Sequence, residues 1–227
     1  MKPVFLNDAV LVSSVEVGGL NLGSGRMDLA SRYVLNAAAR LASVPEELKD
    51  GTGVFMGSKN GCLDVDLRFA ATLDGRPSPR LFARTLPSTP AAEVAVRFGF
   101  KGPNTSIVQD QCAGLLALLA AIQDMESGAC SAAIAGEYDV VDPELDAARG
   151  AQYAAVVLLA DRPLSGNVSY RVDIGGDGTP LPPCRMESES SLRDLCAGLA
   201  SGGSRGEFQW PADNGGLILK LVPVRGS

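Results

Sequence analysis

The stretch of this sequence that could do chemistry lies at residues 102–122, where a cysteine follows a short strand-like run. It reads GPNTSIVQDQCAGLLALLAAI: a glycine-proline turn, β-branched residues, a polar break, and a helix that is apolar on every side. The pattern predicts a strand–turn–helix elbow. Such an elbow can present a nucleophile at a helix N-terminus, where free N–H groups and the helix dipole stabilise a thiolate or an oxyanion. An ordinary strand–helix turn without chemistry is the alternative.

Cys112 is the candidate nucleophile of this elbow, but two features of the sequence argue against it. The chain contains no histidine, so neither a Ser-His nor a Cys-His pair can form within it. Asp110, two residues earlier, disfavours a thiolate by like-charge repulsion. Because free cysteines are among the most buried residues of globular proteins, we expect Cys112 to be structural.

Other polar clusters predict no metal, cofactor or phosphate site. Residues 137–148 read as an acidic loop, but the spacing of its carboxylates does not fit a calcium loop, so we expect solvated side chains. The carboxylates considered are Asp139, Asp142, Glu144 and Asp146. Residues 175–178, GGDG, follow a strand, but no helix opens after them. The five cysteines are an odd number without zinc-like spacing, which indicates a reducing compartment.

The composition predicts a soluble cytoplasmic protein. The 227 residues fit one domain or two small ones, and 46% hydrophobic residues are enough for a sizeable core. The net charge of −6 argues against nucleic acid or anionic lipid as the main partner. The N-terminal sequence MKPVFLND has no apolar core of a signal peptide, and no apolar run approaches a membrane span.

The order of the expected elements predicts a layered α/β fold with both faces of the sheet covered. Alternating or continuous apolar runs predict strands at 10–17, 52–57, 105–108, 131–136, 151–159, 168–174 and 216–222. Apolar periodicity and helix-ending glycines predict helices at 24–41, 63–75, 89–98, 112–126 and 188–199. Ser88 or Thr89 can cap the third of these, with Pro90 in its first turn. A proline-rich connector occupies 76–87.

Several short motifs follow one another along the chain between residues 79 and 136. They are Pro79-Arg80, LPSTPA at 86–91, VA at 94–95, FKGPN at 100–104, the elbow, and AIAG at 133–136. In this order they resemble the N-terminal half of a β-ketoacyl synthase, a condensing enzyme of the thiolase type. Weaker similarity continues through 149–159 and 168–176, and NGG at 214–216 resembles the family's last glycine-rich turn. The resemblance implies a truncated thiolase-like fold, with residues 1–178 as the N-terminal half and 179–227 as a remnant of the C-terminal half.

The resemblance also implies that the nucleophile is missing. The family's nucleophile is a cysteine nine residues after the glycine of its glycine-proline turn, with a glycine commonly third after it. Counting nine residues from Gly102 gives Gln111 rather than Cys112, and Gly114 is then the third residue after Gln111. Anchoring on Cys112 would instead put Leu115 in a small-residue position. Glutamine therefore replaces the nucleophile, with Cys112 one place too late.

With glutamine at that position the chain resembles the chain length factor, which often carries glutamine there. The chain length factor is the catalytically silent partner of type II polyketide ketosynthases. The family's condensing chemistry needs a His-His or His-Asn pair, which a chain without histidine lacks. Only 35 residues stand between Gly178 and Asn214, where a full condensing enzyme has most of a second repeat. The chain thus resembles the shortened chain-length-factor-like subunits of aryl polyene and some Gram-negative aromatic polyketide clusters.

The resemblance further implies a heterodimer with a catalytic ketosynthase, and contact with acyl carrier protein mainly through that partner. The chain would close the far end of the acyl tunnel, with Gln111 as a hydrogen-bonding filler at the interface or in the vestigial pocket. Helix 60–73 is the expected tunnel wall, and the residues expected to gate product length are Leu63, Leu67, Phe69 and Ala70. The segment expected to pair across the dimer axis is Thr105, Ser106, Ile107, Val108 and Gln109. No catalytic residue, metal or cofactor is implied.

Two alternatives remain open at the level of the sequence. The chain could be a malonyl-carrier-protein decarboxylase that uses Gln111, although that role normally uses the family's histidines. It could instead be a scaffold or regulatory pseudoenzyme that binds carrier protein through surface arginines such as Arg80 or Arg84 without gating product length.

Overall fold

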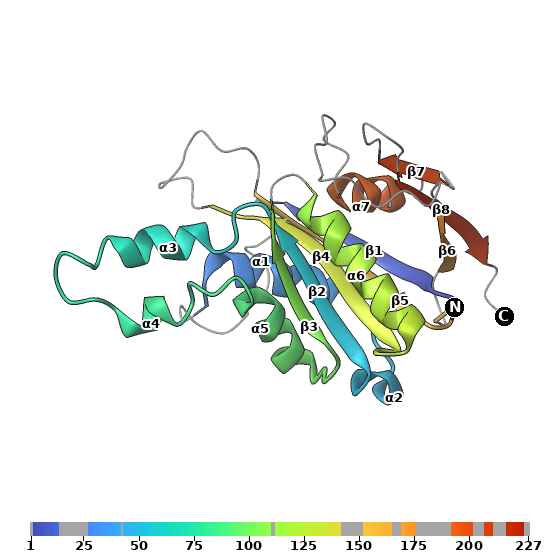
Figure 1. Ribbon diagram of the computed structural model, residues 1–227, viewed down its shortest axis with the longest axis horizontal. Helices are drawn as coiled ribbons and strands as arrows, with labels where there is room; N and C mark the ends of the chain where they lie inside the picture. Colours follow the sequence, from blue (N-terminus) through green and yellow to red (C-terminus); the bar gives the residue numbers. More distant parts are fainter. Residues whose placement is uncertain are drawn as a thin grey trace.

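The computed structural model describes residues 2–13, 27–41, 43–109, 112–141, 152–164, 169–175, 192–201, 207–210 and 217–224. Within these ranges eight strands form one sheet, and helices cover both of its faces (Figure 1). The strands are β1 Phe5–Ser13, β2 Thr52–Ser58, β3 Asn104–Val108, β4 Ala132–Asp139, β5 Tyr153–Ala160, β6 Ser169–Gly175, β7 Glu207–Trp210 and β8 Leu217–Val224. The helices are α1 Leu29–Arg40, α2 Glu46–Lys49, α3 Leu63–Ala70, α4 Pro79–Phe82, α5 Thr89–Phe98, α6 Ala113–Ser127 and α7 Leu192–Ala200.

The sheet is mixed, with the order β3-β2-β4-β5-β1-β6-β8-β7. β2 is parallel to β3 and β4, and the other neighbouring pairs are antiparallel. β1 therefore lies inside the sheet, where Phe5 pairs with Ala160 on one side and with Arg171 on the other. β3 forms one edge. The predicted layered α/β fold is confirmed, and the parallel pairing is confined to the three strands nearest that edge.

The alternation of side chains along β4 divides the core into two layers. Ala132, Ile134 and Tyr138 pack in the layer that α1 and α5 complete, and Ala133 and Ala135 pack in the layer of α6 and α7. The neighbouring strand β5 is buried at every position after its first. A strand covered on both faces gains from apolar side chains at every position, which explains the continuous apolar runs of the sequence.

The helix ends follow local capping signals. Asp28 is the N-cap of α1: its carboxylate accepts hydrogen bonds from the backbone N–H and the hydroxyl of Ser31, at 2.8 and 2.7 Å. The helix therefore begins later than the predicted residue 24. α5 and α6 end at Gly99 and Gly128, whose φ angles of 75° and 83° suit glycine at a helix C-terminus. Ser88 is the N-cap residue of α5, but its side chain makes no capping hydrogen bond.

Residues 59–88, which we call the arm, extend from the end of β2 away from the layered body (Figure 1). They carry α3 and α4. The sequence predicted a proline-rich connector at 76–87 and no helix within it, whereas α4 lies there. The Ser78 hydroxyl accepts from the backbone N–H of Leu81 at 3.3 Å, and Pro79 occupies the first turn, so this short helix has ordinary start signals.

The C-terminal part of the chain adds to the same sheet and the same core. α7 packs beside β1 and β5, and β8 pairs with β6 and β7. The sequence did not predict β7, a strand of four residues. In the part of the chain that the structure describes, no helix is long and apolar enough to cross a membrane.

Candidate functional site

The predicted strand–turn–helix elbow is present between β3 and α6. The two elements are joined by residues 109–112, and Cys112 occupies the N-cap position of the helix. Cys112 is buried in the core layer of α6, where the side-chain amide of Gln109 donates to its Sγ at 3.7 Å. Gln111, which the sequence predicts to replace the nucleophile, lies outside the described residues.

The start of α6 lies directly on the ends of two strands. A Cβ added to Gly57 of β2 would come within 2.2 Å of the carbonyl group of Ala113. A Cβ added to Gly114 would come within 2.4 Å of the Glu137 carboxylate on β4. Both positions therefore require glycine, because backbone and carboxylate already fill the space that a side chain would occupy.

Glu137 is a half-buried carboxylate below this elbow. Its carboxylate accepts hydrogen bonds from the Tyr153 hydroxyl and, at 3.1 Å, from the backbone N–H of Leu192 in the first turn of α7. Burial raises the pKa of this carboxyl, and the two hydrogen bonds oppose that effect. Glu137 thus ties β4 to β5, to α7 and to the start of α6.

The predicted acidic loop at 137–148 was wrong at its beginning, because β4 continues through it to Asp139. Asp139, at the end of the strand, accepts a hydrogen bond from the side-chain amide of Asn60 at 2.6 Å. Asp142, Glu144 and Asp146 lie outside the described residues.

The arm is fastened to the body at the same end of the sheet as the elbow. The Ser58 hydroxyl accepts the backbone N–H of Gly61 at 2.9 Å, and the Cys62 thiol donates to the carbonyl of Leu86 at 3.3 Å. A Cβ on Gly61 would lie 3.4 Å from the Val108 side chain, at the end of β3. The root of the arm and the end of the edge strand are therefore in contact.

The residues expected to gate product length all lie on α3. Leu63 and Phe69 are half-buried, whereas Leu67 and Ala70 are exposed. The ring of Phe69 packs against that of Phe82 on α4, with 5.5 Å between the ring centroids. The prediction of a helix here is confirmed. Phe82 was not singled out from the sequence, because α4 was not expected.

The segment expected to pair across a dimer axis forms the exposed edge of the sheet. β3 pairs with β2 along one side, and among the described strands it has no neighbour on the other. Val108 and Gln109 are exposed, and Thr105, Ser106 and Ile107 are half-buried. The Ser106 Oγ is buried without a hydrogen-bond partner among the described residues. The pairing itself stays a prediction.

Comparison of the sequence with protein families gives one match. The sequence model of the N-terminal domain of β-ketoacyl synthases matches residues 20–144, which is more than half of the chain. The chain belongs to the β-ketoacyl synthase family. The sequence comparison with curated proteins finds no significant match.

Solved structures of the same family share the fold of this β-ketoacyl synthase family member. A chain of "The ishigamide ketosynthase/chain length factor" has a TM-score of 0.69 at 16% identity, over 97% of this chain and 99% of that one. A chain of the ketosynthase ApeO in complex with its chain length factor ApeC, from Xenorhabdus doucetiae, has a TM-score of 0.57 at 15% identity, over 86% and 78%. A β-ketoacyl synthase from Burkholderia phymatum has a TM-score of 0.56 at 15% identity, over 80% and 66%. At these identities the comparisons establish a thiolase-like layered fold.

The cysteines of this family member that the structure describes are buried and form no disulfide with one another. They are Cys62, Cys112, Cys130 and Cys196. Burial raises the pKa of Cys62 to about 12 and that of Cys130 to about 11, so both remain protonated near neutral pH. Among the described residues, no group of three or more metal-ligating side chains could hold a metal ion.

The residue that sequence reasoning missed is Glu137, and a signal for it existed. Side chains of a strand alternate between two faces, and the run from Ala133 to Ala135 places Glu137 on the same face. That face is the one covered by α6. Extending the alternation beyond Gly136 would have put a carboxylate against the elbow helix, where Gly114 leaves room for it.

Proposed function

We propose that this chain is a catalytically silent, chain-length-factor-like partner of a catalytic ketosynthase in type II polyketide or aryl polyene biosynthesis. The ketosynthase would supply the nucleophilic cysteine and the histidines. This chain contains no histidine, and the spacing from Gly102 puts Gln111 rather than Cys112 at the nucleophile position. Two of the structural neighbours carry a ketosynthase and a chain length factor in their names, which supports the proposal. In this proposal residues 1–178 correspond to the N-terminal half of a condensing enzyme and residues 179–227 to a remnant of the C-terminal half.

The observation that carries the proposal is an exposed apolar surface on the arm and the edge strand. Its large apolar side chains are Leu67, Leu73, Phe82, Leu86 and Val108, each at least 40% exposed. Complete burial of a fully exposed side chain of this size is worth about 1.5–3 kcal/mol, and these side chains, which are about half exposed, would gain roughly half of that. Apolar surface of this extent next to an unpaired strand edge fits a partner protein.

A second, smaller apolar strip lies on α6. The sequence predicted that this helix is buried on every side, but Leu116, Leu119 and Ala120 are only partly buried. In a condensing enzyme of full length, residues of the second half could pack on such a strip. We infer that the ketosynthase partner covers part of this surface.

The role of the arm in this proposal is to limit the length of the acyl chain. Leu63, Leu67, Phe69 and Ala70 would form the wall at the far end of the partner's tunnel, supported by the contact of Phe69 with Phe82. Contact with acyl carrier protein would be made mainly through the ketosynthase. Gln111 would occupy the vestigial nucleophile position without chemistry.

The first experiment tests the partner. The full chain is co-expressed with a candidate ketosynthase from its own gene neighbourhood, and the purified material is analysed by size-exclusion chromatography with light scattering. A stable 1:1 complex, in which an affinity tag on one chain also recovers the untagged partner, supports the proposal. A well-behaved monomer that forms no complex would overturn it.

The second experiment tests the tunnel wall in the reconstituted complex. Ala70→Trp on α3 should shorten the products measured by mass spectrometry, because added bulk closes the tunnel earlier. Ala71→Trp is the matched control: Ala71 is the exposed neighbour at the end of the helix, and it is rotated away from Ala70. Products of unchanged length with Ala70→Trp would remove α3 from the wall while leaving the partner role intact.

A further inference from the structure

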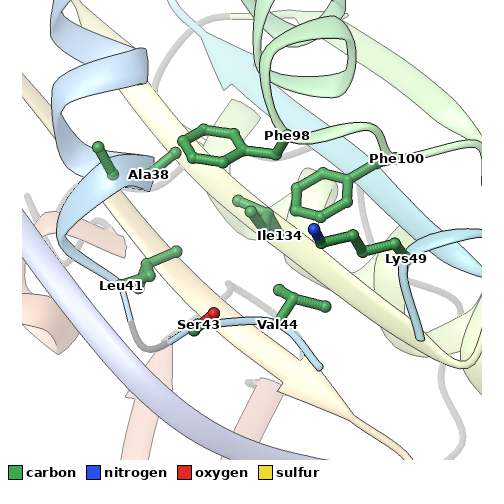
Figure 2. Close-up of a pocket in the computed structure, with 9 residues that line it drawn as sticks. Ala38, Leu41, Ser43, Val44, Lys49, Phe98, Phe100 and Ile134 are labelled. Carbon is green, nitrogen blue, oxygen red and sulfur yellow. The ribbon is translucent and has the colours of Figure 1, made fainter. Parts of the chain in front are cut away.

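A cavity of about 200 Å³ lies on the opposite side of the sheet from the elbow (Figure 2). Its floor is Ile134, in the first half of β4, whose side chain belongs to the α1 and α5 layer. The elbow helix α6 packs on the other face of the same strand. The cavity is therefore separate from every feature used in the proposed function.

The inner walls of this cavity are apolar. Leu41 and Val44 close one side, and Phe98 and Phe100 close the other, with their rings stacked at a centroid distance of 5.7 Å and an interplanar angle of 21°. Ile134 is only 2% exposed. An engineered apolar cavity of about 150 Å³ in another protein holds benzene. A cavity of about 200 Å³ can therefore hold a small ring or a short alkyl chain together with a polar head.

The polar lining consists of Lys49 and Ser43. Figure 2 shows the Lys49 side chain running beside Phe100, with its ammonium group turned into the space above Ile134. The Lys49 Nζ also pairs with the Glu46 carboxylate at 2.5 Å. The Glu46 side chain is 84% exposed, so this pair is a surface ion pair of small net value. An ammonium group has three N–H donors and can serve a second acceptor.

We propose that this cavity binds a small monocarboxylate with an apolar body of about five to seven carbon atoms. The carboxylate would accept hydrogen bonds from the Lys49 ammonium and the Ser43 hydroxyl, and the apolar body would lie between the phenylalanine pair and Ile134. The combination of an apolar chamber and few polar groups is typical of small-molecule sites. A single cation already shared with Glu46 cannot balance a dianion, which favours a carboxylate over a phosphate ester.

Binding of this kind would stabilise the chain in a measurable way. The lining comes from α1, from α2, from the end of α5 and from β4, so a ligand would connect four elements of one core layer. A ligand that binds only the folded state adds RT ln(1 + [L]/Kd) to the stability. At a ligand concentration one hundred times Kd, the unfolding temperature should therefore rise by several degrees.

The test uses hexanoate and benzoate as probes on the purified full chain, or on its complex if the chain is obtained only in that form. Saturation-transfer NMR and calorimetric titration measure the binding of each probe at equal ionic strength. Two compounds serve as controls: acetate has the charge without the apolar body, and hexan-1-ol has the apolar body without the charge. We expect hexanoate and benzoate to bind and the other two to bind at least about tenfold more weakly.

Two variants make the test specific. Lys49→Gln should weaken hexanoate binding at least about tenfold, whereas Lys101→Gln should leave it unchanged. Lys101 is a matched control because it is a nearby lysine in an ion pair, with Asp50 at 2.8 Å, and does not line the cavity. Ala38→Phe should abolish binding by filling the chamber, with circular dichroism used to confirm its fold.

Three results would overturn the assignment. One is an absence of binding by both carboxylates. Another is equal affinity for hexanoate and hexan-1-ol, which would leave an apolar cavity without carboxylate recognition. The last is hexanoate affinity that is the same in Lys49→Gln as in Lys101→Gln. None of these results bears on complex formation with a ketosynthase, so the failure of this proposal and that of the proposed function can be told apart.

Discussion

β5 and the arm are both rich in apolar residues, but they use them in opposite ways. β5 lies inside the sheet with α1 on one face and α6 and α7 on the other, and Leu158 and Leu159 are 0% exposed. The arm buries Cys62 and Val65, but Phe82, which packs against Phe69 within the arm, is 63% exposed. The comparison teaches that the apolar residues of the body determine whether the chain folds, whereas those of the arm are available for association.

Truncation of Leu158 should give the largest effect on stability. Leu158→Ala removes a fully buried side chain from the core layer between the sheet and α1 and should cost about 2–5 kcal/mol of unfolding free energy. Leu73→Ala on the arm makes the same chemical change at a side chain that is 54% exposed, and should stay within about 0.5 kcal/mol. Urea unfolding followed by circular dichroism measures both. Equal losses would show that the arm belongs to the core.

A charge placed on the arm should weaken association with the partner and leave the stability of the chain almost unchanged. Phe82→Asp should weaken association with the ketosynthase by at least about 2 kcal/mol, or roughly thirtyfold in Kd, and leave the unfolding temperature of the chain nearly unchanged. Val96→Asp is the matched control, because Val96 on α5 is also exposed, at 80%, and lies outside the arm. Surface plasmon resonance gives both affinities. If Val96→Asp were the more damaging change, the interface would lie on α5.

Glu137 is a largely desolvated carboxyl within the body, and it should make stability depend on pH. Burial raises its pKa above the ordinary value of 4.5, so the folded chain holds this proton at a pH where the unfolded chain has lost it. The stability that the carboxyl contributes is therefore greatest below about pH 4.5 and falls as the pH rises through the raised pKa. A pKa raised by one unit corresponds to about 1.4 kcal/mol.

Glu137→Gln should remove this dependence. The unfolding free energy of the variant minus that of the wild type should increase between pH 4.5 and neutral pH, as measured by urea unfolding at a series of pH values. Glu46→Gln provides the control, because the Glu46 side chain is 84% exposed. A difference between Glu137→Gln and wild type that does not change with pH would contradict the raised pKa.

The smallest expected effect concerns the ion pair that joins the arm to α1. The Arg84 guanidinium lies 3.1 Å from the carboxylate of Asp28, whose side chain is 2% exposed. Arg84→Gln should cost about 1 kcal/mol and should accelerate hydrogen exchange in α4. Lys101→Gln breaks an exposed pair and should cost less than about 0.5 kcal/mol. Unchanged exchange in α4 would mean that the root of the arm alone holds it in place.

Much of this fold could be predicted from the sequence, because its signals are local. The small-residue strands β4 and β5, the glycine that ends α5 and the strand–helix elbow each depend on residues within one short segment. The family resemblance rests on the same segments, and residues 20–144 match the family model. The predicted helix at residue 63 and onward is likewise a local pattern.

What could not be predicted depends on contacts between distant residues. The residues of β1 do not indicate that Phe5 pairs with Ala160. The position of β1 in the interior of the sheet was therefore not predicted. The role of Phe82 could not be predicted because it depends on the contact of its ring with that of Phe69. Glu137 reads as the start of a polar loop until Tyr153 and Leu192 supply its hydrogen bonds. The assignment of Gln111 to the nucleophile position stays a prediction, because that residue lies outside the described ranges.

The central position of β1 has a consequence for how the chain is made. Its first strand pairs with β5 and β6, so residues near the N-terminus have no sheet partner until about residue 160 has left the ribosome. At about 5–20 residues per second, synthesis of that length takes roughly 8–30 s. During this interval the apolar strand must be shielded from other chains, and β1 can join the sheet only after β5 has been synthesised.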